Sequence, residues 1–202
     1  MTEPEPATPS AVDDEPSGVR LHMGIAEQGK VFALAGDYPR ALFHYREAMR
    51  LAVEAGDPEV FFRHYLECVI EALELMGSYD EVVAYCGKAL ALYADRPPAD
   101  AVTVRDLAHI HQKLGVVRLK QGDRDGARAA LRQALTVLEG SGQTLPLTSN
   151  LLRWLDQGMH VAPRRLEAEL RRAAYFSVRE ATVDRTRAVQ LPEGMRPPGM
   201  GP

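Results

Sequence analysis

Cysteine is nearly absent from this sequence, which narrows the classes of protein that the chain can represent. The 202 residues include two cysteines, Cys68 and Cys86, which are too few for a disulfide framework or a structural zinc site. No apolar run approaches the roughly 20 residues that a membrane-spanning helix needs. The Pro-rich, acidic N-terminus lacks the positive charge and the apolar stretch of a signal peptide. We therefore expect no membrane insertion and a reduced, cytoplasmic compartment.

Aromatic residues are also scarce, at 6% of the chain, whereas Ala and Leu are abundant and charged residues make up 26%. This composition is typical of a soluble helical protein and not of a β-sandwich or a disordered chain. The formal net charge of −4 is unevenly spread: the first residues are acidic, and the C-terminal region is rich in arginine. We expect one all-α domain with tails of opposite charge.

Catalytic and ligand-binding constellations are missing as well. Residues 24–30 match the glycines and the lysine of a P-loop, but Val31 stands where Ser or Thr should hold magnesium, and no strand precedes the segment. His109 and His111 are two residues apart, so on a helix they point to different sides and cannot chelate a metal together. Gly140-Ser141-Gly142 follows a helix pattern, unlike a nucleophile elbow. We expect no enzyme activity, cofactor, metal or small-molecule substrate.

An internal repeat is the most informative feature of the sequence. Three segments superimpose on the turn glycines Gly36, Gly77 and Gly122. In each segment, helix-forming residues precede the glycine, and small residues recur after it, where two helices would approach each other closely. The aligned residues are Gly29, Phe32, Ala41, Tyr45 and Ala48; Ile70, Leu73, Val82, Cys86 and Ala89; and Gly115, Arg118, Ala127, Leu131 and Ala134. The pattern predicts three antiparallel helical hairpins.

The turn sequences Gly-Asp-Tyr-Pro-Arg-Ala at 36–41 and Gly-Asp-Arg-Asp-Gly-Ala at 122–127 resemble the inter-helix turn of the tetratricopeptide repeat (TPR) family. The resemblance covers about residues 20–140. The repeats here are about 41–45 residues apart, longer than the 34 residues of the standard repeat. The resemblance therefore implies the longer-helix variety, and Ile70 and Arg118 depart from its pattern.

Local sequence signals set the expected boundaries. Gly56-Asp57-Pro58 separates the first two repeats, with Asp57 as an N-cap and Pro58 at the first helical position, and Asp95–Asp100 separates the second and third. We predict an all-α helical-hairpin solenoid with C-terminal capping helices. Three TPR-like repeats span 18–140 (18–56, 57–96 and 99–140), and capping and Arg-rich helices follow at 145–185. The last of these helices is expected to run from Pro163 to about Val183. We expect disordered tails at both ends: an acidic Pro-rich tail at 1–17 and a Pro/Gly-rich tail at 186–202.

The TPR resemblance also implies where a partner would bind, because the first helix of each repeat in this family lines a concave groove. The repeat register assigns to that groove the polar residues Glu27, Lys30, His64, Glu67, Glu71, Glu74, His109, Gln112, Lys113 and Lys120. Glu67, Glu71 and Glu74 are spaced by four and three residues, which places them on one helical face as an acidic wall. Lys113 and Lys120 make the corresponding helix of the third repeat basic. The alternative is an ordinary polar helix surface.

A second candidate surface lies in the predicted last helix, whose arginines are spaced by seven. Its residues are Arg164, Arg165, Arg171, Arg172 and Arg179. Such a stripe is either a solvated face paired with nearby glutamates or a site for an acidic protein surface or phosphates. Nucleic acid is the less favoured ligand, because no aromatic residues are interleaved for base stacking.

From these features we expect a non-catalytic adaptor or scaffold that binds a peptide or helix of a partner protein in the groove. A secretion- or assembly-type chaperone for one client protein is the alternative, and nucleic-acid binding through the basic C-terminal helix is a remote third. The family branch that clamps a terminal carboxylate uses Lys, Arg and Asn, and of the corresponding residues here only Lys113 and His109 are compatible with that role. The sequence does not identify the partner or the oligomeric state.

Overall fold

The structure is a computed structural model that describes residues 18–191. Within this range it contains helices and no strand. The elements are α1 (Gly18–Leu34), α2 (Tyr38–Glu54), α3 (Glu59–Met76), α4 (Tyr79–Asp95), α5 (Ala101–Lys120), α6 (Arg124–Val137), α7 (Pro146–Asp156), α8 (Pro163–Arg172) and the short 3₁₀ helices η1 (Glu180–Thr182) and η2 (Arg185–Arg187).

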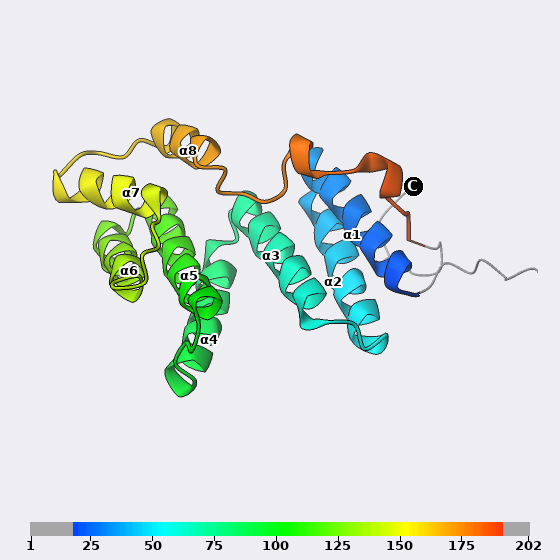
Figure 1. The fold of residues 1–202 in the computed structure, drawn as a ribbon. Coiled ribbons are helices and arrows are strands. Elements are labelled where there is room, and N and C mark those ends of the chain that lie inside the picture. The colour runs from blue at the N-terminus through cyan, green and yellow to red at the C-terminus, as the bar shows by residue number, and fades with distance from the viewer. Residues whose placement is uncertain (1–17, 192–202) are drawn as a thin grey trace, which may run out of the picture.

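Consecutive helices pack against each other, so the chain forms a helical-hairpin solenoid (Figure 1). The predicted all-α solenoid is thereby confirmed. The turn glycines Gly36, Gly77 and Gly122 have φ values of 78°, 84° and 83°. This left-handed conformation ends the first helix of each hairpin, and glycine adopts it without the steric strain that a side chain would cause. After two of these turns, Asp37 and Asp123 cap the second helix by accepting backbone N–H groups of Arg40 and Gly126.

None of the helices in residues 18–191 is both long enough and apolar enough to cross a membrane.

The first and third hairpins are tightly closed because each has a glycine where its two helices meet. A Cβ atom on Gly29 would lie 2.7 Å from the Tyr45 ring of α2, and one on Gly115 would lie 2.6 Å from Leu131 of α6. The aligned residue of α3 is Ile70, a half-buried side chain. An isoleucine leaves no room for such an approach, and α3 packs more extensively on α2 than on its own hairpin partner α4.

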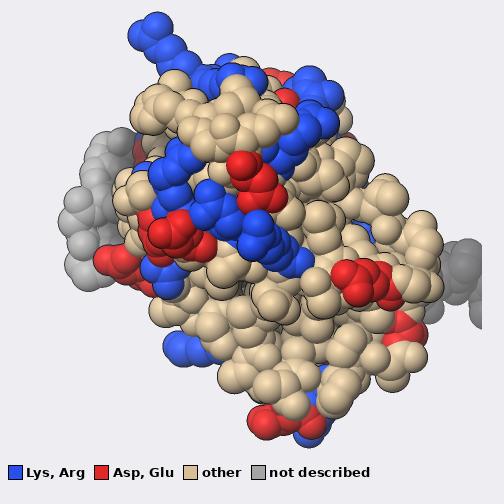
Figure 2. Space-filling view, turned by 90° about the vertical axis from the view of Figure 1, so that its left-hand side faces the viewer, with Lys and Arg blue, Asp and Glu red and all other residues tan. Residues whose placement is uncertain are grey.

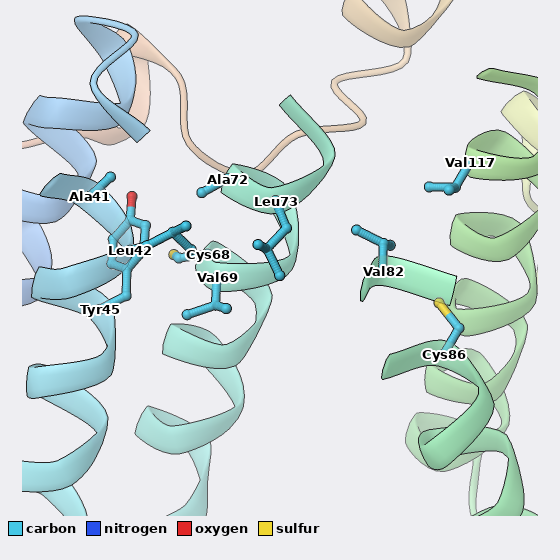
Figure 3. Packing of buried hydrophobic residues seen from close by; sticks show 10 residues of the cluster. All are labelled: Ala41, Leu42, Tyr45, Cys68, Val69, Ala72, Leu73, Val82, Cys86 and Val117. Atoms are coloured by element: carbon cyan, nitrogen blue, oxygen red, sulfur yellow. The ribbon is translucent and has the colours of Figure 1, made fainter. Parts of the chain in front are cut away.

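We call the α3–α4 hairpin the open hairpin, because its two helices contact each other less than those of the other two hairpins. An apolar cluster with members from α2, α3, α4 and α5 lies around it (Figure 3). Leu73 points from α3 toward Val82 and Cys86 of α4, and Val117 of α5 completes this side. The other members lie on α2 and α3. The α3–α4 hairpin is therefore held through its neighbours, α2 and α5, more than by direct contact between its own helices.

Helix α7 covers the end of the third hairpin as predicted, and its Leu151 and Leu155 are fully buried against α5 and α6. Helix α8 then adds Leu166 and Leu170 to the same cluster. The prediction that this last helix continues to about Val183 is wrong, because α8 ends at Arg172. Ala174 adopts a positive φ of 49°, and beyond it the chain is extended with two single 3₁₀ turns.

The predicted tails are only partly within the described range. Residues 1–17 and 192–202 lie outside it, so disorder there stays a prediction. The expected start of the C-terminal tail at 186 is wrong, since 185–187 form η2 and Leu191 is buried against α1. The structured region therefore extends to at least Leu191.

A buried polar network joins the first repeat to the second. His22 of α1 lies with Nδ1 2.6 Å from the Tyr65 hydroxyl of α3 and with Nε2 2.8 Å from Asp57 Oδ2. The predicted role of Asp57 as an N-cap is wrong, because Pro58 occupies the cap position of α3. Asp57 instead faces His22, a partner 35 residues earlier in the chain, which no local pattern indicates.

Candidate functional site

The first helices of the three hairpins, α1, α3 and α5, share one face of the solenoid, which we call the inner face. It carries most of the residues that the repeat register predicted for a partner-binding site. It is crossed by residues 173–191, the C-terminal segment, which leaves α8, passes the C-terminal part of α3 and ends beside α1 (Figure 1). A segment of the same chain thus occupies part of the surface where a partner was predicted to bind.

Glu74 of α3 is the center of the contact between the inner face and the segment. Its carboxylate accepts hydrogen bonds from Lys113 Nζ at 3.0 Å and Lys120 Nζ at 2.6 Å, both on α5. The Tyr175 hydroxyl of the segment donates a third bond at 3.0 Å. The carboxylate therefore joins α3, α5 and the segment in one cluster.

Glu71, one turn earlier on α3, binds the backbone of the segment. Its two carboxylate oxygens accept the consecutive N–H groups of Ser177 at 2.6 Å and Val178 at 3.1 Å. A carboxylate that accepts hydrogen bonds from two consecutive backbone N–H groups recognizes an extended main chain and not a particular side chain. The side chain of Val178 packs against the central apolar cluster.

Two neighboring aromatic rings of the segment lie against the lysines of α5. Lys113 Nζ is 4.0 Å from the center of the Tyr175 ring, and Lys120 Nζ is 5.2 Å from that of Phe176. The rings meet edge to face with their centers 4.8 Å apart. These are the distances of cation–π and aromatic pair contacts, so each lysine binds both Glu74 and an aromatic ring.

The far end of the segment is attached to α1. The backbone N–H of Asp184 donates to Glu27 Oε1 at 2.5 Å, and that of Val189 to the carbonyl of Gly24 at 2.9 Å. A Cβ atom on Gly24 would lie 2.5 Å from Val189 Cγ2 and 3.0 Å from the Arg187 carbonyl. A glycine is therefore needed at this position for the segment to reach α1.

The structure brings six of the ten predicted groove residues together under the segment: Glu27, Lys30, Glu71, Glu74, Lys113 and Lys120. Lys30 takes part through its 3.0 Å ion pair with Glu27. The other four lie apart from the segment's polar contacts. Glu67 and His109 are exposed, and His64 is half-buried beside Cys68. Gln112 is buried and accepts a hydrogen bond from Thr148 of α7.

The prediction of an open acidic wall is therefore wrong. Glu71 and Glu74 are each 1% exposed, and only Glu67 of the trio faces solvent. The register did not anticipate the segment that contacts Glu71 and Glu74 and buries them. A charge reversal at Glu71 would consequently disturb folding.

The electrostatics of the buried carboxylate follow from its neighbors. Burial alone raises the pKa of Glu74, but the ammonium groups of Lys113 and Lys120 outweigh that effect and hold its pKa below the ordinary value. Glu74 is thus ionized at neutral pH. Burial next to that negative charge raises the pKa of Tyr175 well above its ordinary value, so the tyrosine keeps the proton that it donates to Glu74.

The arginines of the second candidate surface are not one stripe. Arg172 pairs with Glu169, and the Arg165 guanidinium lies 4.3 Å from the center of the Trp154 ring. Arg179 lies beyond the end of α8, in the extended segment, while Arg164 and Arg171 are exposed on α8. Figure 2 shows positive side chains interspersed with carboxylates on this end of the molecule, and Asp156 pairs with both Arg128 and Arg132 of α6.

The residues with possible chemical roles have structural explanations. Residues 24–30, the P-loop-like sequence, lie within α1, with Gly24 against the segment and Gly29 against Tyr45. Cys68 and Cys86 are both buried, and burial raises the pKa of the Cys68 thiol to about 12. In the part of the chain that the structure describes, no cluster of His, Cys, Asp and Glu has the arrangement of a metal site.

Sequence reasoning missed the residues that occupy the inner face, from Tyr175 to Val178. The available signal was Tyr175-Phe176, two adjacent aromatic residues in a chain with 6% aromatics, just after the last amphipathic helix turn. The expected continuation of that helix hid the signal. Comparisons of the chain with protein-family models, with curated proteins and with solved structures found no match.

Proposed function

We propose that this protein is a non-catalytic adaptor of the TPR type, whose inner face binds an extended peptide of a partner protein. The observation that carries the proposal is the segment itself. An extended chain crosses α5, α3 and α1 in turn and is bound through its backbone at Glu71 and Glu27. Helical-repeat proteins commonly bind partners along such an extended surface.

The chemistry of the inner face supports peptide recognition in particular. Carboxylates that accept backbone N–H groups supply affinity for any extended chain, and lysines under aromatic rings supply preference among side chains. None of these contacts requires a nucleotide, a metal or a reactive side chain. Two buried free thiols fit a reducing, cytoplasmic setting.

The proposal is tested by placing a photoreactive amino acid in the full chain, expressed in its native cell. His109 and Glu67 are suitable positions because both are exposed and lie on the helices that form the inner face. We expect irradiation to attach one discrete partner protein at these positions. Lys88 on α4, which is exposed and outside the inner face, is the matched control position.

The pattern of attachment decides between surfaces. Attachment at His109 and Glu67 but not at Lys88 agrees with the proposal. Attachment at Arg164 or Arg171 alone would contradict it, because the partner would then bind the arginine-rich surface of α8.

A further inference from the structure

We propose that residues 175–191 occupy the partner's place, and that the partner's peptide has the same chemistry: two adjacent aromatic residues, then a small and an aliphatic residue, in an extended chain. This inference rests on the proposed function. The free protein is accordingly closed by its own segment, and the partner binds by displacing it. Because the occupant is seen in place, it defines what the inner face recognizes.

The contacts of Tyr175, Phe176 and Val178 show three side-chain requirements. The first aromatic residue has a hydroxyl that reaches Glu74, and both rings lie over the ammonium groups of α5. The aliphatic residue enters the central cluster. Between them the small Ser177 has a buried hydroxyl without a hydrogen-bond partner, so a glycine or an alanine at this position of a partner peptide would fit at no polar cost.

The hinge for displacement lies between α8 and Tyr175. Ala174 has a positive φ of 49°, a strained conformation for a residue with a side chain, and Ala173 and Ala174 are exposed. Beyond Val178, residues 179–182 and 184–187 are exposed, and the segment's hydrogen bonds to α1 are the backbone bonds from Asp184 to Glu27 and from Val189 to Gly24. Leu166 and Leu170 of α8 lie before the hinge, so release of the segment removes only Tyr175 from the apolar cluster that α8 forms with α7.

Attachment through a short hinge makes the segment a strong competitor. A tethered ligand has an effective concentration on the order of millimolar, so a peptide added in solution must overcome this advantage. Weakening the segment's own side-chain contacts should remove much of the competition while leaving the inner face intact.

The test measures binding of a fluorescent synthetic peptide of residues 173–191 to the full chain. The Tyr175→Ala/Phe176→Ala variant should bind it at least tenfold more tightly than the wild type, whereas the surface control Lys88→Ala should bind like the wild type. A peptide with its two aromatic residues replaced by alanine should bind at least tenfold more weakly than the natural peptide. Equal binding of the peptide by wild type and double variant would overturn the inference.

A second measurement needs no substitution and covers the case in which the double variant fails to fold. In ¹⁵N-labeled wild-type chain, excess unlabeled peptide should shift the amide signals of Ser177 and Val178 to those of a free chain. Unchanged signals at saturating peptide would overturn the inference, as would a dimer in which two copies exchange segments. Partner attachment at His109 together with either negative result would leave the proposed function standing and remove this inference alone.

Discussion

The closed hairpins and the open hairpin show two ways of holding a helical repeat together. In the first and third hairpins, Gly29 and Gly115 let the partner helix approach until its Tyr45 or Leu131 fills the space. In the second, Ile70 stands at the aligned position, and α3 is held by charged groups of α5 and by the C-terminal segment. The repeat that is weakest as a hairpin is thus the one that carries the polar contacts of the inner face.

The largest expected effect comes from removing the charge that holds the open hairpin. Glu74→Ala leaves Lys113 and Lys120 without their common partner and should cost about 3–5 kcal/mol of unfolding free energy, as for other broken buried pairs. Urea denaturation of the full chain measures this cost. The matched control is Glu67→Ala on the same helix, whose exposed side chain should cost within about 0.5 kcal/mol. Similar costs for both variants would show that the cluster contributes little.

A closed hairpin should instead fail when its glycine is replaced. Gly115→Val would place atoms within 2.6 Å of Leu131 and 3.3 Å of the Ala127 carbonyl, and overpacking of this kind costs about 3 kcal/mol. The matched control is Gly87→Ala on α4, where a Cβ atom meets nothing within 4 Å. That change should be neutral or stabilize by up to about 1 kcal/mol. Thermal melts of the two variants provide the comparison.

Acid should weaken the open hairpin first. The folded state holds the pKa of Glu74 below its ordinary value of 4.5, so this carboxylate adds stability above about pH 4.5, and that stability is lost as the pH falls through the lower folded value. The unfolding free energy of the wild type should therefore decrease more steeply between pH 5 and pH 3 than that of Glu74→Gln. Parallel curves for the two proteins would contradict the ionized cluster.

The smallest effect is expected at the residue that keeps the hairpin open. Ile70→Ala removes a half-buried side chain that no partner helix surrounds closely, so it should cost about 1 kcal/mol. This is less than the cost of Gly115→Val, although both residues occupy the same register position. A cost near 3 kcal/mol, measured by urea denaturation, would mean that Ile70 packs as tightly as the closed hairpins do.

The repeat pattern predicted the fold well because its signals are local. Gly36, Gly77 and Gly122 each mark a turn that the neighboring residues alone determine. The helix register also grouped Glu71, Glu74, Lys113 and Lys120, which lie together around the segment in the structure. The course of the chain after Arg172 was not predictable in this way. It depends on contacts between Tyr175 and Glu74, or Val189 and Gly24, that lie about 100 or more residues apart.

The position of the segment could also not be deduced from its composition. Arg179 continues the arginine spacing of the predicted last helix, yet it lies beyond α8 in the extended segment and is exposed. Part of what holds the segment is its backbone, through Ser177, Val178 and Asp184, and backbone donors are the same at every residue. Gly24 carried a signal in retrospect, since its close approach to Val189 requires a glycine inside a helix.

The central claim is that the inner face of α1, α3 and α5 binds an extended chain, and hydrogen exchange tests it most directly. The amide protons of Ser177 and Val178 lie outside any helix and are bonded to Glu71 alone. In the full-length protein we predict that both exchange at least tenfold more slowly than in the free peptide 173–191, and that Glu71→Ala removes this protection. Exchange of both amides at the rate of the free peptide would contradict the account, because the segment would then not occupy the inner face.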